Sequence, residues 1–504
     1  MAERSDTQGE DAYGAFRAFH VRVLLALTVV AALLRLFRLG DWSFWVDEAH
    51  TFRDATSPAD EFWRSNVSNY PLGYLLLRGM LGTGLVPATN EGWLRLPFAF
   101  FGIVSIPMLA VLGRALVGRR AAILAAAFLT LSPWHIYWSQ NARGYAPELL
   151  FSMIGIFALY HTSRERSVLL GACSLICIAI AGAWHPSGLA GMVVLLAFLS
   201  IELTFQPELR ARLFRPPSVL LAAVLLVGLG IWLLPTLKTA IVNKPEFSLV
   251  HLVQTFAWFL RPEFVAASLA GLLLMILRAG RRETALLASW GIAPFVVLIL
   301  LGSTVMKVTA QYGLLILPPA LLLTARLIVE IADAVREVGL IPRLLRWSLP
   351  TILLASLCSE DFFYYFQRSG DRPRFREAAT YLRNARQGPL TVYTSNIPSM
   401  TYYLDRRAFY GSADRDTEVL GFSKKDMRDA GGGARFFDKV VADAQQAQRE
   451  LWVVITAPEL AEWDMDGGFD VSLRNHAFQV ERLPCWLGPK DMTVLVYRVP
   501  GTPR

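Results

Sequence analysis

Charged residues are scarce in this chain. They make up 18% of its 504 residues, whereas 54% of the residues are hydrophobic. Soluble globular proteins carry about a quarter charged residues, so the composition excludes an ordinary soluble protein and predicts an integral membrane protein. The formal net charge of +8 does not indicate a nucleic-acid partner, because the sequence contains no basic stripe with interleaved aromatic residues. Arginines gathered on one side of a membrane would give the same balance.

Cysteine is also rare, with four residues in the whole chain. Cys173, Cys177 and Cys358 lie in apolar runs, and only Cys485 lies in a polar region. Cys173 and Cys177 share one helix face, but no further Cys or His completes a metal-binding set with them. We therefore expect neither a disulfide nor a cysteine metal site. No cofactor is predicted with certainty, and a divalent metal elsewhere is left open.

Long apolar runs organise most of the chain. Segments of about 17–25 apolar residues can span a bilayer as helices. Such runs occur near 21–39, 94–117, 120–138, 145–161, 167–184, 186–204, 218–236, 265–279, 284–302, 312–330 and 347–366. The fold class that they predict is an α-helical polytopic membrane protein of about eleven transmembrane helices.

Arginine is distributed unevenly among the links that join these runs. When residues 1–20 are placed in the cytoplasm as an N-terminal tail, the inside links are rich in arginine, and the outside links near Ala142, Pro186 and Ser303 are poor in it. This is the positive-inside pattern of membrane proteins. The inside arginines are Arg119, Arg120, Arg164, Arg166, Arg210, Arg212, Arg215, Arg278, Arg281, Arg282, Arg336, Arg343 and Arg346. We therefore predict a first outside loop over residues 40–93.

Two shorter apolar stretches are predicted to lie along the outer interface. If residues 71–86 crossed the membrane, every later link would change sides and the arginine pattern would fail. This stretch is therefore expected to form an interfacial helix within the first outside loop. Residues 249–260 are expected to form another.

The composition changes after the last apolar run. Residues 367–504 are more charged and richer in glycine, and they alternate helix and strand patterns. Helices are predicted at 374–386 and 398–404, and buried strands at 390–394, 451–456 and 492–498. The expected organisation is thus a tail over 1–20, a transmembrane domain over 21–366, and a small extracytoplasmic α/β domain over 367–504.

Several polar residues gather at the outer ends of the predicted spans. The candidates are Asp47 and Glu48 after the first span, Asn69 and Tyr70 before the interfacial helix, Arg95 at the second span, Gln140, Arg143 and Tyr145 after the third, and His185 after the fifth. Arginines can hold a phosphate group bidentately. A carboxylate can remove a proton from an attacking hydroxyl group. The combination suits chemistry on a phosphate-bearing lipid.

The order of these motifs resembles a known superfamily. The segments are Trp45-Val46-Asp47-Glu48-Ala49, Pro71-Leu72-Gly73-Tyr74, Leu94-Arg95-Leu96-Pro97, Gln140-Asn141-Ala142-Arg143-Gly144-Tyr145 and Tyr312-Gly313-Leu314. Together they resemble the GT-C membrane glycosyltransferases, specifically the relatives of protein O-mannosyltransferases (glycosyltransferase family 39) and of lipid A aminoarabinose transferases. The resemblance covers about residues 20–330. No single motif is specific, but their order and spacing are.

The resemblance implies both an activity and residue roles. In such enzymes an acceptor hydroxyl group attacks a polyprenyl-phosphate-linked sugar outside the cytoplasm. Asp47 matches the acid taken as catalytic base, and Glu48 completes the acidic pair. Arg95 matches the arginine that binds the lipid phosphate, and Arg143 matches the arginine of the family's Gln-Glu-Ala-Arg segment. The chain departs from the family pattern at Asn69, Asn141 and Gln311, which puts in doubt a metal site in the first loop and the identity of the sugar and the acceptor.

The predicted function is therefore that of an inverting glycosyltransferase in the cytoplasmic (inner) membrane. The donor would be a polyprenyl-phosphate hexose or pentose, and the acceptor a glycan, lipid or protein of a bacterial cell envelope. A transporter or flippase of lipid-linked sugars is the main alternative, although it would favour charges near the bilayer midplane rather than at helix ends. A non-catalytic scaffold that binds a glycan through residues 367–504 is another.

Each assigned role also has a structural alternative. Asp47 can cap a helix in the loop, and Arg95 can reach the lipid interface with its long side chain. Arg143 can neutralise Glu148, and His185 can be an ordinary residue at a helix end.

Overall fold

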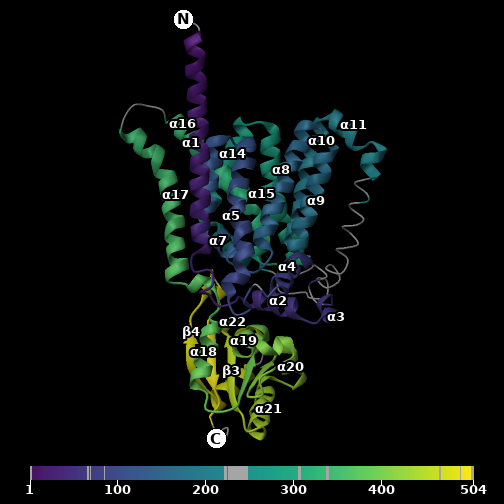
Figure 1. Cartoon of the computed structure of the whole chain (residues 1–504), viewed down its shortest axis with the longest axis vertical. Coiled ribbons are helices and arrows are strands. Elements are labelled where there is room, and N and C mark those ends of the chain that lie inside the picture. Colours follow the sequence, from purple (N-terminus) through teal and green to yellow (C-terminus); the bar gives the residue numbers. More distant parts are fainter. Residues whose placement is uncertain are drawn as a thin grey trace. The chain divides into compact units, whose positions relative to one another are not determined.

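A computed structural model describes most of the chain. The described residues are 3–64, 67, 70–84, 86–220, 224, 248–304, 308–335, 340–464, 467–488 and 490–500. They form two compact units (Figure 1). The first, here called the helical unit, comprises Met1–Leu39, Ser68–Gly73 and Arg95–Phe362. The second, here called the mixed unit, comprises Gly40–Val67, Tyr74–Leu94 and Phe363–Arg504.

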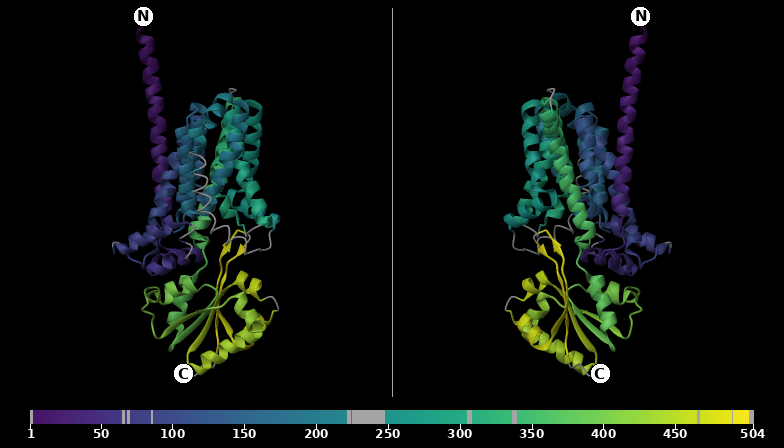
Figure 2. Two further views of the ribbon diagram at one scale, coloured as in Figure 1. Left: turned by 90° about the vertical axis from the view of Figure 1, so that its right-hand side faces the viewer. Right: turned by 90° about the vertical axis from the view of Figure 1, so that its left-hand side faces the viewer.

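Long helices make up the helical unit. They are α1 (Glu3–Leu36), α5 (Glu91–Leu116), α6 (Arg119–Thr130), α7 (Pro133–Ser139), α8 (Tyr145–Glu165), α9 (Val168–Trp184), η2 (Pro186–Leu189), α10 (Ala190–Phe205), α11 (Pro207–Leu213), α13 (Leu249–Leu260), α14 (Pro262–Arg278), α15 (Arg281–Thr304), η3 (Ala310–Ile316), α16 (Leu317–Ala334) and α17 (Leu340–Phe366). Helices α8, α9, α10 and α15 run side by side (Figures 1 and 2).

Several of these helices can cross a membrane. Within the described residues, four are long and apolar enough: Glu91–Leu116, Pro186–Phe205, Arg281–Ser303 and Ala310–Ala334. The number rises to six if two bent pairs each count as one span, α6 with α7 at 60° and α13 with α14 at 91°. The chain is therefore a multi-pass membrane protein.

The predicted spans can be compared with these helices. Every predicted run falls on helical segments except 218–236, which lies almost wholly outside the described residues. The run 120–138 is divided into α6 and α7 by a bend of 60°. The count of about eleven crossings and their direction stay predictions. The two stretches expected at the interface form α4 (Pro71–Gly82) and α13. The bend of 91° between α13 and α14 is what an interfacial helix would need before it enters a span.

Glycine permits a close approach between α14 and α16. A Cβ atom added at Gly271 would lie 2.2 Å from the backbone oxygen of Leu323. Small residues at such crossings let helix backbones touch, which is a common way to pack helices in lipid. By contrast, a Cβ atom added at Gly291 in α15 meets nothing within 4 Å.

The mixed unit contains a sheet of five strands. In the order β2-β1-β3-β7-β4 they are β2 (Thr417–Gly421), β1 (Leu390–Thr394), β3 (Glu450–Thr456), β7 (Val494–Arg498) and β4 (Phe478–Leu483). β1 is parallel to β2 and β3, and β7 is antiparallel to β3 and β4. β5 (Trp486–Leu487) and β6 (Lys490–Asp491) form a separate antiparallel pair.

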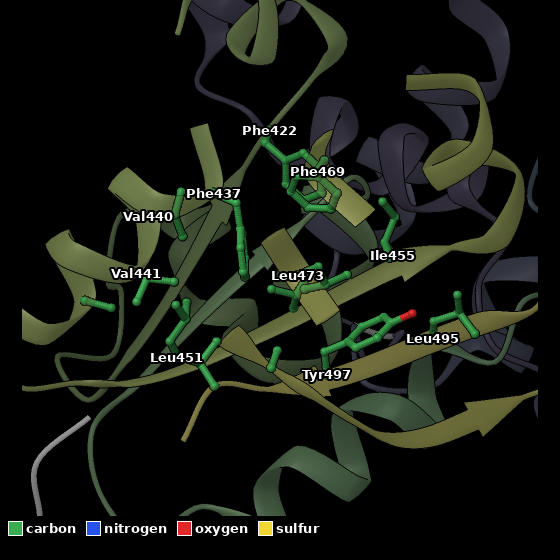
Figure 3. Packing of buried hydrophobic residues seen from close by; sticks show 14 of the residues in the cluster. Phe422, Phe437, Val440, Val441, Leu451, Ile455, Phe469, Leu473, Leu495 and Tyr497 are labelled. Carbon is green, nitrogen blue, oxygen red and sulfur yellow. The ribbon is translucent and has the colours of Figure 1, made fainter. Parts of the chain in front are cut away.

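Helices cover both faces of this sheet (Figure 2). One face packs against α20 (Lys424–Asp429), α21 (Gly433–Gln446), α22 (Ala457–Trp463) and α23 (Gly468–His476). In this core, alternate residues of β3, Leu451 and Ile455 among them, meet Phe437 and Phe469 (Figure 3). Helices α18 (Phe375–Ala385) and α19 (Ile397–Leu404) lie on the other side. The predicted helices and strands of residues 367–504 coincide with α18, β1, α19, β3 and β7, whereas β2 and β4 were not predicted.

The first outside loop belongs to the same unit as the C-terminal residues. It contains α2 (Val46–Thr56), α3 (Ala59–Phe62) and most of α4. This grouping differs from the predicted division, which placed residues 40–93 with the spans. Aromatic packing accounts for it, because the Tyr402 ring in α19 lies 4.5 Å from the Phe44 ring and 4.9 Å from the Phe52 ring, measured between centroids.

Candidate functional site

The predicted site residues are divided between the two units. Asp47 and Glu48 belong to the mixed unit, and Tyr70, Arg95, Gln140, Arg143, Tyr145 and His185 belong to the helical unit. Asn69 lies outside the described residues.

Asp47 lies in the first turn of α2. The helix begins after Trp45, whose backbone is extended, and Asp47 is its second residue. The side chain is half-buried. The partial positive charge at a helix N-terminus stabilises a carboxylate in this position. Asp47 is thus an ionisable group that solvent can reach, held by a regular helical turn.

Glu48, the next residue, is in a different environment. It is fully buried, and its Oε2 atom accepts a hydrogen bond of 2.9 Å from the backbone N–H of Trp45. The same oxygen lies 3.5 Å from Nε of Arg372, which is also fully buried. A glutamate three residues after the cap that reaches back to the cap backbone fixes the start of a helix. These contacts hold the Glu48 carboxylate inside the mixed unit, whereas Asp47 is half-buried, and the predicted catalytic roles of both acids stay predictions.

In the helical unit, Ser187 joins His185 to Glu148. The Nδ1 atom of His185 lies 2.6 Å from Oγ of Ser187 and accepts a hydrogen bond of 3.3 Å from the backbone N–H of Ser187. The Ser187 hydroxyl group donates to Oε2 of Glu148 over 2.8 Å. Sequence reasoning missed Ser187 as a site residue. The sequence His185-Pro186-Ser187 carries the signal, because a serine two residues after a histidine can bond its ring nitrogen.

Aromatic rings surround His185. Its ring centroid lies 4.2 Å from that of Tyr145 and 5.7 Å from those of Tyr70 and Tyr312. The guanidinium carbon of Arg143 lies 5.6 Å from the Tyr70 ring centroid. The structure therefore brings together four of the predicted residues and adds Tyr312 to them.

The charge of His185 follows from this environment. The residue is 5% exposed and lies between α9 and α10, outside the spanning helices. Burial, and then the positive charge of Arg143, lower the pKa of His185 well below its ordinary value of 6.5. The ring is neutral near pH 7.

Arg95 and Gln140 both contact the end of α1. Arg95 is fully buried in α5, and its Nη1 atom donates to the backbone oxygen of Leu39 over 3.0 Å. Nε2 of Gln140 donates to the oxygens of Leu34, Arg35 and Phe37 at 3.3, 3.1 and 2.8 Å. The last carbonyl groups of a helix lack partners within it. The amide of Gln140 therefore caps carbonyl groups at the end of α1, and its predicted substrate contact stays a prediction.

Metal-binding side chains are not clustered in the described part of the chain. Among the described residues, no group of three or more His, Cys, Asp or Glu side chains is arranged to hold a metal ion.

Known proteins resemble this chain in structure but not detectably in sequence. No family model matches the sequence, and no curated protein matches it. Among solved structures, ArnT from Cupriavidus metallidurans bound to undecaprenyl phosphate is similar over 95% of this chain and 99% of its own, with a TM-score of 0.56 and 13% identity. The chain therefore shares the fold of ArnT. The predicted resemblance to the GT-C proteins is confirmed at the level of the fold.

Two further solved structures are also similar in fold to this chain. The Archaeoglobus fulgidus oligosaccharyltransferase in the apo form matches 91% of this chain and 72% of its own, with a TM-score of 0.57 and 12% identity. AglB from the same organism, in complex with an inhibitory peptide and a dolichol-phosphate, matches 92% and 72%, with a TM-score of 0.53 and 11% identity. A shared fold hosts many activities, so the function is argued from the residues.

Proposed function

We propose that this protein transfers a sugar from a polyprenyl-phosphate donor to a hydroxyl acceptor. The observation that carries the proposal is the fold likeness to ArnT bound to undecaprenyl phosphate, which extends over nearly the whole of both chains. The residues around Arg143 support it, because they offer groups of the kind that a lipid phosphate requires.

The phosphate would be held by residues of the helical unit. Arg143 supplies a guanidinium group that can bind phosphate oxygens bidentately. His185 supplies an imidazole ring beside Arg143, and Tyr70 and Tyr312 supply hydroxyl groups on rings that lie near the His185 ring. Arg95 is proposed as a further phosphate ligand. As the bond to the sugar breaks, negative charge grows on the leaving phosphate, and each well-placed donor then contributes a few kcal/mol to stabilisation of the transition state.

The proton of the acceptor would be removed by Asp47. In this proposal Asp47 accepts the hydroxyl proton while the acceptor oxygen forms a bond to the anomeric carbon. The bond between that carbon and the phosphate oxygen breaks, and its electron pair stays with the lipid phosphate. A single displacement of this kind inverts the configuration at the anomeric carbon, by the same logic as in inverting glycosidases. Asp47 is suited to this role because it is ionisable and accessible, whereas Glu48 is buried in an ion pair.

The location of the reaction is also proposed. Arginine-rich links on one side of the predicted spans support a location of the first loop and the C-terminal residues outside the cytoplasm. We therefore assign the reaction to the outer face of the cytoplasmic membrane, with an envelope glycan, lipid or protein as acceptor.

A single-turnover assay tests the proposal. Purified protein in nanodiscs is supplied with synthetic undecaprenyl-phosphate hexoses and pentoses and an envelope extract as acceptor. Asp47→Asn should abolish transfer and leave the binding of undecaprenyl phosphate unchanged. The matched control is Asp60→Asn, which alters an exposed acid in the first turn of α3 in the same loop. Transfer by Asp47→Asn at the parent rate would rule out Asp47 as the base. Movement of the lipid-linked sugar across a liposome bilayer without transfer would favour a flippase.

A further inference from the structure

Arg376 binds the chain segment that leads into α2. This residue lies in α18, near the start of the C-terminal residues. Its Nη1 atom donates to the backbone oxygen of Asp41 over 2.8 Å. Its Nη2 atom donates to the oxygens of Gly40 and Trp42 over 2.9 and 3.1 Å. A guanidinium group has five donors in a rigid plane, so one arginine can fix several successive carbonyl groups.

Further bonds continue this attachment up to Phe44. The backbone N–H of Arg376 donates to Oγ of Ser43 over 3.0 Å, and that hydroxyl group donates to Oε2 of Glu377 over 3.0 Å. The backbone N–H of Phe44 donates to the Tyr403 hydroxyl group over 2.6 Å. Each residue from 40 to 44 is therefore bonded to α18 or α19.

A second attachment lies on the other side of Asp47. Arg372 pairs with Glu48 in a position where both side chains are fully buried. Arg372 is itself held by a bond of 3.0 Å from Nη1 to the backbone oxygen of Gly370. Gly370 has a φ of +65° and packs so closely on the Trp42 ring that a Cβ atom would lie 2.7 Å from it. Asp47 thus lies between two points at which the C-terminal residues hold the chain.

We propose that Arg376 and Arg372 are positioning residues that fix the Asp47 carboxylate for sugar transfer. The inference rests on the proposed function in one respect, which is the role of Asp47 as base. Attachment of residues 40–48 sets where α2 begins, and hence where its second residue points. Displacement of a catalytic group by about 1 Å can lower a rate about 100-fold, so loss of this attachment should affect the chemical step. The C-terminal residues would then serve the reaction by holding the loop that carries the base.

The experiment compares arginine variants of the full chain in nanodiscs. Arg376→Ala removes the bonds to residues 40–42, and Arg376→Lys keeps the charge but not the planar fork. The matched control is Arg449→Ala. Arg449 also binds backbone oxygens, those of Leu390 and Arg415, but in the sheet region. Hydrogen exchange of residues 40–56 is followed by mass spectrometry, together with kcat, KM and the binding of undecaprenyl phosphate.

The expected result is specific to the loop. Arg376→Ala should raise exchange in residues 40–56 and lower kcat by about 10- to 100-fold with little change in KM. Arg376→Lys should show a smaller rise in exchange and a smaller loss of kcat than Arg376→Ala. Arg449→Ala should change neither the exchange of residues 40–56 nor kcat. Exchange in Arg376→Ala equal to that in Arg449→Ala would overturn the attachment. Raised exchange with an unchanged kcat would overturn the positioning role.

Failure of the proposed function would give a different pattern. If Asp47→Asn transfers sugar at the parent rate, Asp47 is not the base and the positioning role falls with it. The exchange of residues 40–56 would still decide, without any substrate, whether Arg376 holds the loop.

Discussion

Nε of Arg372 lies 3.5 Å from Oε2 of Glu48, and neither side chain is accessible to solvent. Two charges removed from water in this way stabilise a fold little more than an apolar pair would, but loss of one partner leaves the other charge buried and unpaired. Asp47, one residue earlier, is half-buried. Two adjacent acids with the same chemistry thus have different surroundings, and we expect them to have different roles.

Neutralising these two acids should have opposite consequences. Glu48→Gln should lower the free energy of unfolding by about 3–5 kcal/mol, because the buried Arg372 guanidinium loses the carboxylate charge that offsets its own. Asp47→Asn should change stability by less than about 1 kcal/mol and abolish transfer. Denaturant unfolding of the purified protein, followed alongside single-turnover transfer, measures both. Equal stability of the two variants would contradict the assignment of Glu48 to structure.

Ser187 should affect lipid binding through His185. Ser187→Ala removes the hydroxyl group that lies between His185 and Glu148, so the His185 ring loses part of its orientation. A net loss of about 1 kcal/mol corresponds to about fivefold weaker binding of undecaprenyl phosphate. Titration of the lipid in nanodiscs measures it, with the exposed Ser303→Ala as control. Unchanged affinity of Ser187→Ala would remove His185 from the proposed phosphate site.

His185 should make stability depend on pH. Burial and the nearby Arg143 charge lower the pKa of His185 in the folded protein, whereas in the unfolded chain the pKa is about 6.5. The unfolded chain therefore binds a proton more readily. The stability that this group contributes is fully present above about pH 6.5 and is lost as the pH falls from there toward the lower folded-state pKa.

The melting temperature measures this effect. Between about pH 7 and pH 5 the parent protein should lose more stability than His185→Asn, because the variant has no titratable side chain at position 185. His161→Asn is the control, since His161 faces Glu165 rather than Arg143. The same pH dependence in parent and His185→Asn would contradict the predicted state of the ring.

Two glycines in neighbouring helices should respond differently to alanine. Gly271→Ala forces α14 away from α16, because the new Cβ atom would lie 2.2 Å from the Leu323 backbone oxygen. Such overpacking typically costs about 1–3 kcal/mol. Gly291→Ala meets nothing within 4 Å and should be neutral or slightly stabilising, since alanine favours the helix. The melting temperatures of the two variants are compared with that of the parent protein. An unchanged melting temperature of Gly271→Ala would show that α14 and α16 do not pack closely at Gly271.

Much of the fold could be read from the sequence because the relevant signals are local. Apolar runs produced helices wherever the residues are described, since a chain in lipid must satisfy its backbone groups within each segment. Strands β1 and β3 were predicted because both are buried along nearly their whole length. β2 and β4 were missed because they are the edge strands of the sheet and carry mixed, partly exposed residues.

Within the candidate site, the sequence alone determined residue types and their order. That was enough to group Tyr70, Arg143, Tyr145 and His185, and to predict the GT-C fold. Tertiary structure decided how the polar groups are used. The Gln140 amide caps a helix end because it bonds to two carbonyl groups of α1 and to that of Phe37 just after it, more than 100 positions earlier. Such roles depend on contacts between residues that are distant in the chain, and a local sequence pattern cannot predict these contacts.

The acidic pair Asp47 and Glu48 also shows what the sequence determined and what the tertiary structure decided. The motif resemblance took Asp47 as the base and Glu48 as its neighbour in the acidic pair, but the sequence gave no sign that the surroundings of the two acids differ. Only the fold put Glu48 against Arg372, more than 300 residues later, and left Asp47 accessible. The physical reason is burial, because a charge without water must find an opposite charge, and the partner came from a remote part of the chain.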